Sequence, residues 1–124
     1  MTKALASFFL VFTASILLFG GPAHAIENWK IVPNKEVCMV TNMHFSRLQI
    51  PVEQSGKTYY GCCENCKATI KNDASSRLAT DPQTQKSIDK SKAVIAANEA
   101  GSVLYFENRA NFEKYVSTLA GMEK

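Results

Sequence analysis

Four cysteines are the residues of this chain best suited to chemistry, and three of them share one short stretch. Cys62, Cys63 and Cys66 stand together, whereas Cys38 lies well before them. A thiolate can bind a soft metal ion or attack a disulfide, and neighbouring groups decide how readily a thiol ionises. The spacing therefore predicts thiolate chemistry, and its kind depends on the elements that carry the four sulfurs.

The three clustered cysteines are predicted at the junction between a strand and a helix. Lys57 to Tyr60 alternates polar and aromatic residues that favour strands, and Gly56 before it is a turn residue. A helix is predicted over residues 64–72, so that Cys62 and Cys66, four residues apart, face the same side of its first turn. The unpaired N–H groups at the start of that helix favour thiolate over thiol.

Cys38 is predicted to reach this junction through a hairpin. It lies in a short apolar run, and a second short strand is predicted within Phe45 to Val52. The turn at residues 54–56 then leads the chain back toward the helix start. One ligand from a hairpin and two from a helix start is an arrangement expected of a metal site. The predicted metal ligands are Cys38, Cys62 and Cys66, with Cys63 as an auxiliary thiol.

A second strand-to-helix unit without cysteines is predicted further along the chain. Gly101 to Phe106 repeats the glycine turn and aromatic strand of Gly56 to Gly61. The same alignment places Glu107 and Asn111 where the first unit has Cys62 and Cys66. The first unit is therefore predicted to carry the chemistry and the second to serve packing.

The segments between and after these units carry further predictions. Asp81-Pro82 is expected to end the helical region, and Lys86 to Lys92 is expected to be an exposed loop or short extended arm. Val103 to Phe106 is predicted as a buried strand, and Asn108 as the cap of a closing helix. The apolar stripe of that helix is predicted to pack in the core and consists of Phe112, Tyr115, Val116 and Leu119.

Residues 1–25 have the pattern of a secretory signal peptide. Lys3 precedes an uncharged apolar run from Ala4 to Phe19, and Ala23-His24-Ala25 supplies the small residues that a signal peptidase requires. We expect cleavage after Ala25 and a periplasmic or secreted protein, with an uncleaved membrane anchor as the alternative. Residues 26–124 then form one small α+β domain of two related units, about 37–72 with the cysteines and about 81–119 without them.

Composition limits the partners of this domain. The net charge of the 124-residue chain is only +3, which is too weak a bias to predict binding to nucleic acid or to an anionic membrane. Four cysteines in a small exported domain would by default form two disulfides. The spacing argues against that framework, because only one of the three clustered sulfurs could sensibly pair with Cys38 while the others stay crowded together.

On these residues the chain resembles the YHS and TRASH family of small cysteine-containing metal-associated domains. The resemblance rests on Cys38-Met39-Val40, on Gly56-Lys57-Thr58-Tyr59-Tyr60, on Cys62-Cys63-Glu64-Asn65-Cys66-Lys67 and on the spacing between them. It implies metal ligands at Cys38, Cys62 and Cys66. It also implies a part in heavy-metal sensing, trafficking or resistance, with copper, zinc and mercury as the metals. The chain departs from the family pattern at Met39 and Gly61 and by its additional Cys63.

The predicted ligand set suits a soft or borderline ion, Cu(I) or Zn(II). Cu(I) accepts two or three thiolates, whereas structural zinc prefers four ligands. The candidates for a fourth ligand are Cys63, His44, Met39 and Met43, or there is none. We expect the protein to buffer the ion or to exchange it with a metal-donor or metal-acceptor protein, without acting as an enzyme.

Two other functions fit the same cysteines. Cys63 and Cys66 have the two-residue gap of a thiol-disulfide redox motif at a helix start, although the sequence offers no obvious proline to face them. A disulfide- or zinc-stabilised interaction module is the third hypothesis. Acid-base catalysis is not predicted, because the acidic residues are scattered over faces that should be solvated.

Overall fold

The computed structural model describes residues 27–122, so the predicted signal peptide and its cleavage point lie outside the described residues. The strands are β1 (Lys30–Val32), β2 (Val37–Cys38), β3 (Met43–His44), β4 (Ile50–Gln54), β5 (Lys57–Gly61), β6 (Leu78–Thr80), β7 (Ser87–Asp89), β8 (Val94–Ala97) and β9 (Val103–Phe106). The helices are α1 (Glu64–Asn72) and α2 (Arg109–Gly121), and two short 3-10 helices are η1 (Asn34–Glu36) and η2 (Ala74–Arg77). The predicted α+β class is confirmed.

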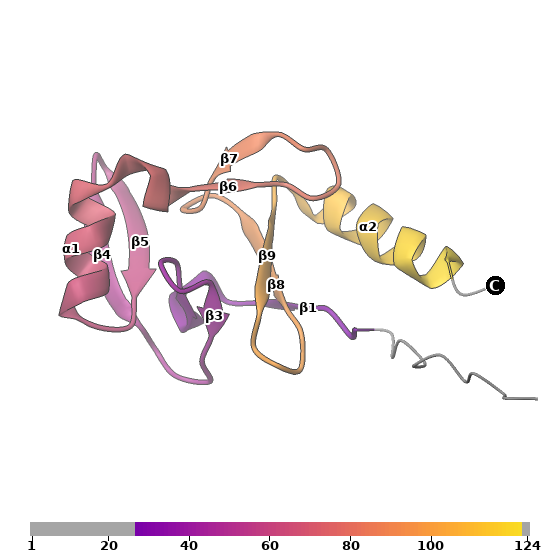
Figure 1. Cartoon of the computed structure of the whole chain (residues 1–124), viewed down its shortest axis with the longest axis horizontal. Helices are drawn as coiled ribbons and strands as arrows, with labels where there is room; N and C mark the ends of the chain where they lie inside the picture. The colour runs from indigo at the N-terminus through magenta and orange to yellow at the C-terminus, as the bar shows by residue number, and fades with distance from the viewer. Residues whose placement is uncertain (1–26, 123–124) are drawn as a thin grey trace, which may run out of the picture.

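The strands form one small sheet and three hairpins. The sheet has the order β1, β8, β9, and the hairpins are β2–β3, β4–β5 and β6–β7, with antiparallel pairing throughout. Helix α1 lies beside the β4–β5 hairpin at one end of the molecule, and α2 extends from the end of β9 at the other (Figure 1). The β6–β7 hairpin lies between the two ends.

The β4–β5 hairpin positions the strand that leads into the cysteines. Its two turn residues, Ser55 and Gly56, have positive φ values of 54° and 72°. Two successive left-handed residues match the twist of a tight two-residue hairpin. The strand predicted within Phe45 to Val52 begins only at Ile50, because Leu48 is exposed and the chain bends where Arg47 donates its N–H to the Phe45 carbonyl (2.7 Å).

The hydrophobic core joins the two halves of the chain into one domain. From the first half the core takes Val37, Met39, Val52, Tyr59 and Ile70. From the second half it takes Ala93, Ile95, Ala97, Val103 and Tyr105. Because neither half buries its apolar residues alone, the halves should fold as one cooperative unit.

The two halves have the same order of elements, a short hairpin followed by a longer hairpin and a helix. The turn of each short hairpin contains a residue with positive φ, Asn42 (55°) in the first and Gln85 (62°) in the second. The N-cap residues also match, since Cys63 has φ −156° and ψ 173° while Asn108 has φ −157° and ψ 170°. The side chain of Asn108 caps the second helix as predicted, by accepting a hydrogen bond from the Asn111 N–H.

The prediction that the apolar stripe of α2 lies in the core was wrong. No side chain of this helix is buried among the described residues, and its four stripe residues are half-buried. Two aromatic residues of the helix pack against Phe106, whose ring centroid lies 5.5 Å from those of Phe112 and Tyr115. Only the first half of α2 is therefore held by aromatic packing.

The prediction that Lys86 to Lys92 is an exposed arm was also wrong in part. Ser87–Asp89 forms strand β7, which pairs with β6, and Lys90 is only 5% exposed. The polar composition of the segment hid one side chain that turns inward. This side chain donates to the carbonyl of Met39, the residue after Cys38.

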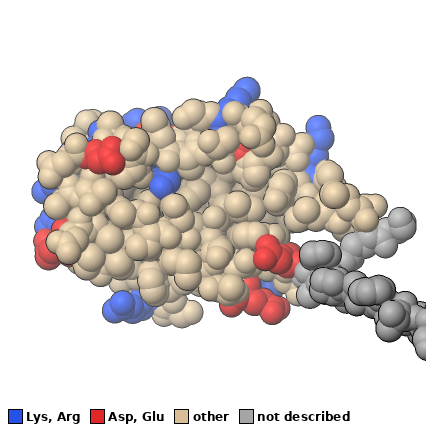
Figure 2. Space-filling model, in the orientation of Figure 1, with Lys and Arg blue, Asp and Glu red and all other residues tan. Residues whose placement is uncertain are grey.

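Charged side chains are spread over the surface. Figure 2 shows lysines and arginines scattered singly among acidic and neutral side chains on the visible face, in keeping with the small net charge. Within residues 27–122, no helix is long and apolar enough to cross a membrane.

Candidate metal centre

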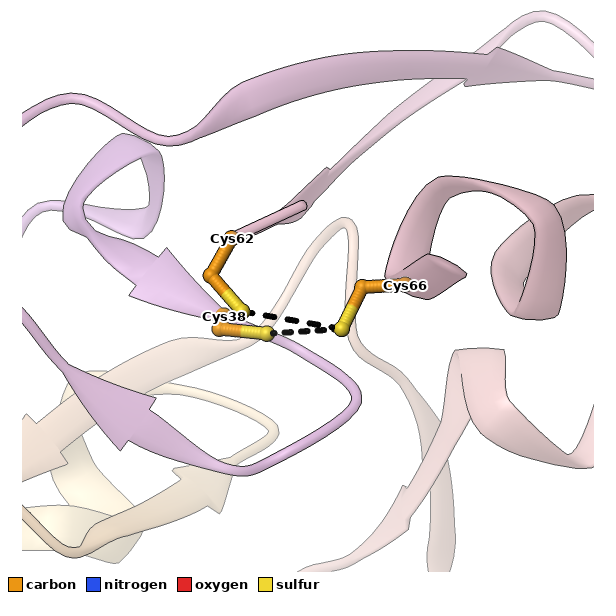
Figure 3. Close-up of side chains that lie close together, drawn as sticks. All are labelled: Cys38, Cys62 and Cys66. Carbon is orange, nitrogen blue, oxygen red and sulfur yellow. Dashed lines mark hydrogen bonds between the residues drawn. The ribbon is translucent and has the colours of Figure 1, made fainter. Parts of the chain in front are cut away.

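Three sulfurs from three separate elements meet at one point. Cys38 ends strand β2, Cys62 follows strand β5, and Cys66 lies in the first turn of α1 (Figure 3). The Cys66 Sγ atom lies 3.7 Å from the Cys38 Sγ atom and 3.6 Å from the Cys62 Sγ atom. All three sulfur atoms lie within 4.8 Å of one another. The predicted approach of Cys38 to the helix start is therefore confirmed.

These separations suit the ligands of a single ion. A Zn–S bond of about 2.3 Å places two sulfurs of a tetrahedral site about 3.8 Å apart, and a trigonal site places them slightly further apart. The two shortest separations are close to this value. Cys38, Cys62 and Cys66 could therefore hold a metal ion with little movement of the backbone.

Gly61 allows the strand and the helix to approach so closely. A Cβ atom at this position would lie 2.9 Å from the Cys66 Cβ atom, which is too close for two carbon atoms. Cys62 follows directly and lies outside the helix, because Cys63 is the N-cap residue and the helix begins at Glu64. Cys62 therefore lies just before the helix, and its sulfur faces that of Cys66 as predicted, at 3.6 Å.

The sulfur of Cys38 accepts hydrogen bonds from its own loop and from the backbone at Cys62. Burial acts to raise the pKa of this side chain, which has no exposed surface. Hydrogen bonds from the hydroxyl and N–H of Thr41 and from the N–H groups of Val40 and Cys62 outweigh that effect and lower the pKa to about 7. Cys38 is therefore the member of the group most readily converted to thiolate, before any metal binds.

The other two grouped thiols keep their protons more firmly. Burial and contacts with the neighbouring sulfurs raise the pKa of Cys66 to about 12. Hydrogen bonding with Cys38 and burial raise the pKa of Cys62. A metal ion that binds the whole group must displace these protons, so binding and proton release are linked.

Cys63 lies beside the group at its exposed edge. Its Sγ atom is 3.6 Å from that of Cys66, but it does not belong to the set of sulfurs that all lie within 4.8 Å of one another. Hydrogen bonding with the backbone and side chain of Cys66 lowers its pKa. The side chain is exposed, whereas Cys38 and Cys66 are buried. Cys63 is thus an auxiliary thiol by position.

The remaining candidates for a fourth ligand have other partners. His44 Nε2 lies 3.1 Å from Glu36 Oε2, and Met39 packs in the hydrophobic core. The Met43 methyl group lies against Gly101, 3.3 Å from the position that a Cβ atom would occupy there. Among the described residues, no histidine nitrogen and no carboxylate oxygen lies within 4.8 Å of all three sulfurs.

Asp81, a buried carboxylate in the second half, accepts hydrogen bonds in the same pattern as Cys38 does in the first half. The Asp81 Oδ1 atom accepts from the N–H groups of Gln83 (2.7 Å) and Thr84 (3.3 Å), as Cys38 accepts from the residues two and three further on. Its Oδ2 atom accepts from the Glu107 N–H and from Asn111 Nδ2, both at 2.8 Å. In the second unit, hydrogen bonds to Asp81 thus link the strand end to the helix start, whereas in the first unit three sulfurs meet at this position.

The sequence prediction placed Glu107 and Asn111 at the positions of Cys62 and Cys66 but missed Asp81. Asp81-Pro82 was expected to end a helical region and to carry part of the weaker family resemblance of the second unit, but the burial of Asp81 was not predicted, and its side chain is fully buried. Burial acts to raise its pKa, but the four hydrogen bonds outweigh this and lower it. An Asp followed two and three residues later by free N–H groups is a common turn pattern, and this signal could have identified it.

Lys90 connects the second half to the cysteine loop and was also missed. Its Nζ atom donates to the Met39 carbonyl (2.6 Å) and to Asn42 Oδ1 (2.9 Å), and lies 5.0 Å from the centre of the Tyr105 ring. The Tyr105 hydroxyl donates to the same Asn42 oxygen (2.9 Å). These contacts fix the loop of residues 38–42, which carries Cys38. No pattern in the polar segment around Lys90 distinguishes it from its exposed neighbours.

Comparisons with known proteins gave no match to a family model, to a curated protein or to a solved structure. The resemblance to the YHS and TRASH family therefore stays a prediction from the cysteine spacing.

Proposed function

We propose that this protein reversibly binds one soft or borderline metal ion through Cys38, Cys62 and Cys66, in the manner implied by its resemblance to YHS and TRASH domains. The observation that carries the proposal is the meeting of three sulfur atoms within 4.8 Å of one another. Cys38 and Cys66 come from distant parts of the chain, and both are buried.

The proposal includes buffering or hand-over of the ion rather than a purely structural role. A structural zinc site is usually closed by four protein ligands, whereas three thiolates leave one position open. The exposed Cys63 lies next to Cys66, so it can replace one ligand of the group while a partner protein supplies another thiolate. Ligand exchange of this kind suits a metal-donor or metal-acceptor protein as the partner.

Cu(I) and Zn(II) are the ions that fit the site, because thiolates bind both. Three thiolates also satisfy Cu(I) without a further ligand. We place the protein in the periplasm or outside the cell, on the basis of the signal-peptide pattern. Exchange there requires the thiols to be kept reduced, since an oxidising compartment favours disulfides.

Metal titration with a count of free thiols tests the proposal. We expect the reduced protein to bind one equivalent of Cu(I) or Zn(II) and thereby protect three thiols from an alkylating reagent, with Cys63 left reactive. Binding of neither ion, with two disulfides formed quantitatively in air, would instead identify a disulfide scaffold. Mass spectrometry of the alkylated peptides assigns the protected residues.

A thiol-disulfide redox function is the second candidate, and one observation favours it. Cys63 is exposed with a lowered pKa, while Cys66 three residues on is buried with a raised pKa. An attacking thiol and a protected resolving thiol differ in the same way. Reduction of a test disulfide by the metal-free protein, lost in Cys63→Ser, would support this function over metal binding.

A further inference from the structure

Within residues 27–122, no carboxylate lies within 4.0 Å of the buried Lys90 amine to balance its charge. Each of the ion pairs found within residues 27–122 involves other side chains, and the two oxygens that accept from Lys90 Nζ belong to a backbone carbonyl and an amide. Burying an uncompensated ammonium costs several kcal/mol, so a buried lysine generally has a negative partner nearby. The face of the Tyr105 ring offsets only part of this cost.

The negative partner available to Lys90 is the cysteine group. Lys90 Nζ donates to the carbonyl of Met39, the residue that follows Cys38, and both cysteine and lysine are buried. Burial lowers the pKa of Lys90, and negative charge on Cys38 acts in the opposite direction. The ammonium and the thiolates therefore interact through a medium in which charge is poorly screened.

On the basis of the proposed metal binding, we propose that Lys90 is a charge-compensating residue that biases the three-cysteine site toward a monovalent ion over a divalent one. Three thiolates with a monovalent ion carry a net charge of −2, whereas the same thiolates with a divalent ion carry −1. A fixed positive charge beside the site stabilises the more negative complex by the larger amount. Lys90 does so without contacting the ion.

The same contacts also give Lys90 a structural part, because they fix the loop that carries Cys38. A loosened loop would weaken the binding of every ion by a similar factor. The loss of charge weakens the binding of the monovalent ion more. The ratio of the two affinities is therefore the measurement that separates the two effects.

Competition titrations with Cu(I) and Zn(II) against chromophoric chelators test the inference on the reduced full chain. In Lys90→Met we expect the Cu(I) affinity to fall at least about tenfold further than the Zn(II) affinity, since at an effective dielectric constant of about 20 one unit of charge shifts a binding equilibrium by about this factor even from about 12 Å away. Lys90→Gln should give the same change of ratio and retains a hydrogen-bond donor if the methionine variant folds poorly.

Three matched variants serve as controls. Lys92→Met removes an exposed lysine two residues away and should leave both affinities unchanged. Tyr105→Phe removes the hydroxyl that donates to Asn42 while the charge stays, so it should lower both affinities by the same factor. Lys90→Arg keeps the charge and should keep the ratio.

Equal loss of both affinities in Lys90→Met and Lys90→Gln would overturn the inference, since Lys90 would then only hold the loop. A larger loss for Zn(II) would overturn it as well. If the wild-type protein binds neither ion, the proposed function itself is wrong. If the wild-type protein binds both ions but the ratio of the two affinities does not change in the Lys90 variants, only the inference about Lys90 is wrong.

Discussion

At the scale of single residues, the site is a group of sulfurs that differ in exposure and acidity. Cys66 is its centre, because the sulfurs of Cys38, Cys62 and Cys63 all lie 3.6 to 3.7 Å from its own. Cys38 has the pKa nearest neutrality, and Cys63 is the exposed member. These differences lead to two predictions.

Serine substitutions should separate the ligands from the auxiliary thiol. Cys38→Ser, Cys62→Ser and Cys66→Ser each remove one soft ligand, so we expect each to lower the metal affinity by at least about tenfold. Cys63→Ser is the matched control and should change the affinity by less, while slowing transfer of the ion to a competing chelator. Competition titration and stopped-flow absorbance measure the two effects. A loss in Cys63→Ser as large as in the other three would place Cys63 among the ligands.

The acidity of Cys38 should make the stability of the reduced, metal-free protein depend on pH. The pKa of Cys38 is about 7 in the fold, below the ordinary cysteine value of 9.0, so between these pH values the unfolded chain binds the extra proton and stability rises with pH. Above pH 9 the trend reverses, because Cys66 with its pKa of about 12 keeps its proton only in the fold. Denaturant titrations of wild type and Cys38→Ser measure this, and a rise from pH 7 to 9 that is equally large in the variant would contradict it, since the lowered pKa of Cys63 contributes a rise in both proteins.

The cysteines could be predicted as a site because their residue type and their spacing in the sequence both indicate thiolate chemistry. Asp81 and Lys90 could not be predicted in the same way, since a charged residue in a polar segment is most often solvated. Their burial results from tertiary contacts across the chain, to Glu107 and Asn111 for Asp81 and to Met39 and Asn42 for Lys90. Pairing over such sequence distances has no local pattern.

At the scale of elements, the strand-to-helix junction was the most predictable part. Helix α1 has the predicted bounds, because its N-terminal glutamate, its alternating charges and the following Asp73 are local signals. Strands β2 and β3 are each only two residues long and depend on pairing with one another, so their limits could not be found from periodicity. The bend at Arg47 and Leu48 was missed for the same reason.

Gly61→Ala should disturb this junction directly. The added methyl group would lie 2.9 Å from the Cys66 Cβ atom, so strand β5 and helix α1 must move apart. We expect a loss of about 1 to 3 kcal/mol in the free energy of unfolding, as for other overpacked positions, together with weaker metal binding. Gly121→Ala is the control, because a Cβ atom there meets nothing within 4 Å. Denaturant unfolding and metal titration of both variants provide the comparison, and equal behaviour of the two would rule out the close approach.

Asp81→Asn should destabilise the cysteine-free half. The Asp81 carboxylate accepts four hydrogen bonds, and an amide in its place would turn its N–H₂ group toward two of the donors. We expect a cost of about 2 to 3 kcal/mol in the free energy of unfolding. Asp73→Asn, at an exposed cap of η2, is the matched control and should cost less than about 1 kcal/mol. A folded Asp81→Asn protein should still bind one metal ion, and loss of stoichiometric binding would show that the second unit does more than pack.

At the scale of the whole molecule, several contacts hold the two halves together. The Lys57 amine and the Tyr59 hydroxyl of the first half both donate to the Asp89 carboxylate of the second, at 2.5 Å and 3.0 Å. The core also contains residues of both halves. A change at the three-cysteine site should therefore alter the stability of the entire domain.

Metal binding should raise the thermal stability of the whole domain. A ligand that binds only the folded state at about 100 times its Kd adds about 2.7 kcal/mol to the free energy of unfolding. We expect a single transition, whose midpoint rises by several degrees with Cu(I) or Zn(II) in wild type and much less in Cys38→Ser. Calorimetry of both proteins with and without the ion checks this, and two separate transitions would contradict a shared core.

The most direct test of the three-sulfur site is X-ray absorption at the metal edge of the reduced, loaded protein. The geometry predicts three sulfur neighbours at about 2.3 Å in wild type and one fewer in Cys38→Ser, with no change in Cys63→Ser. A first shell of nitrogen and oxygen alone, or a sulfur count unaffected by Cys38→Ser, would contradict the site.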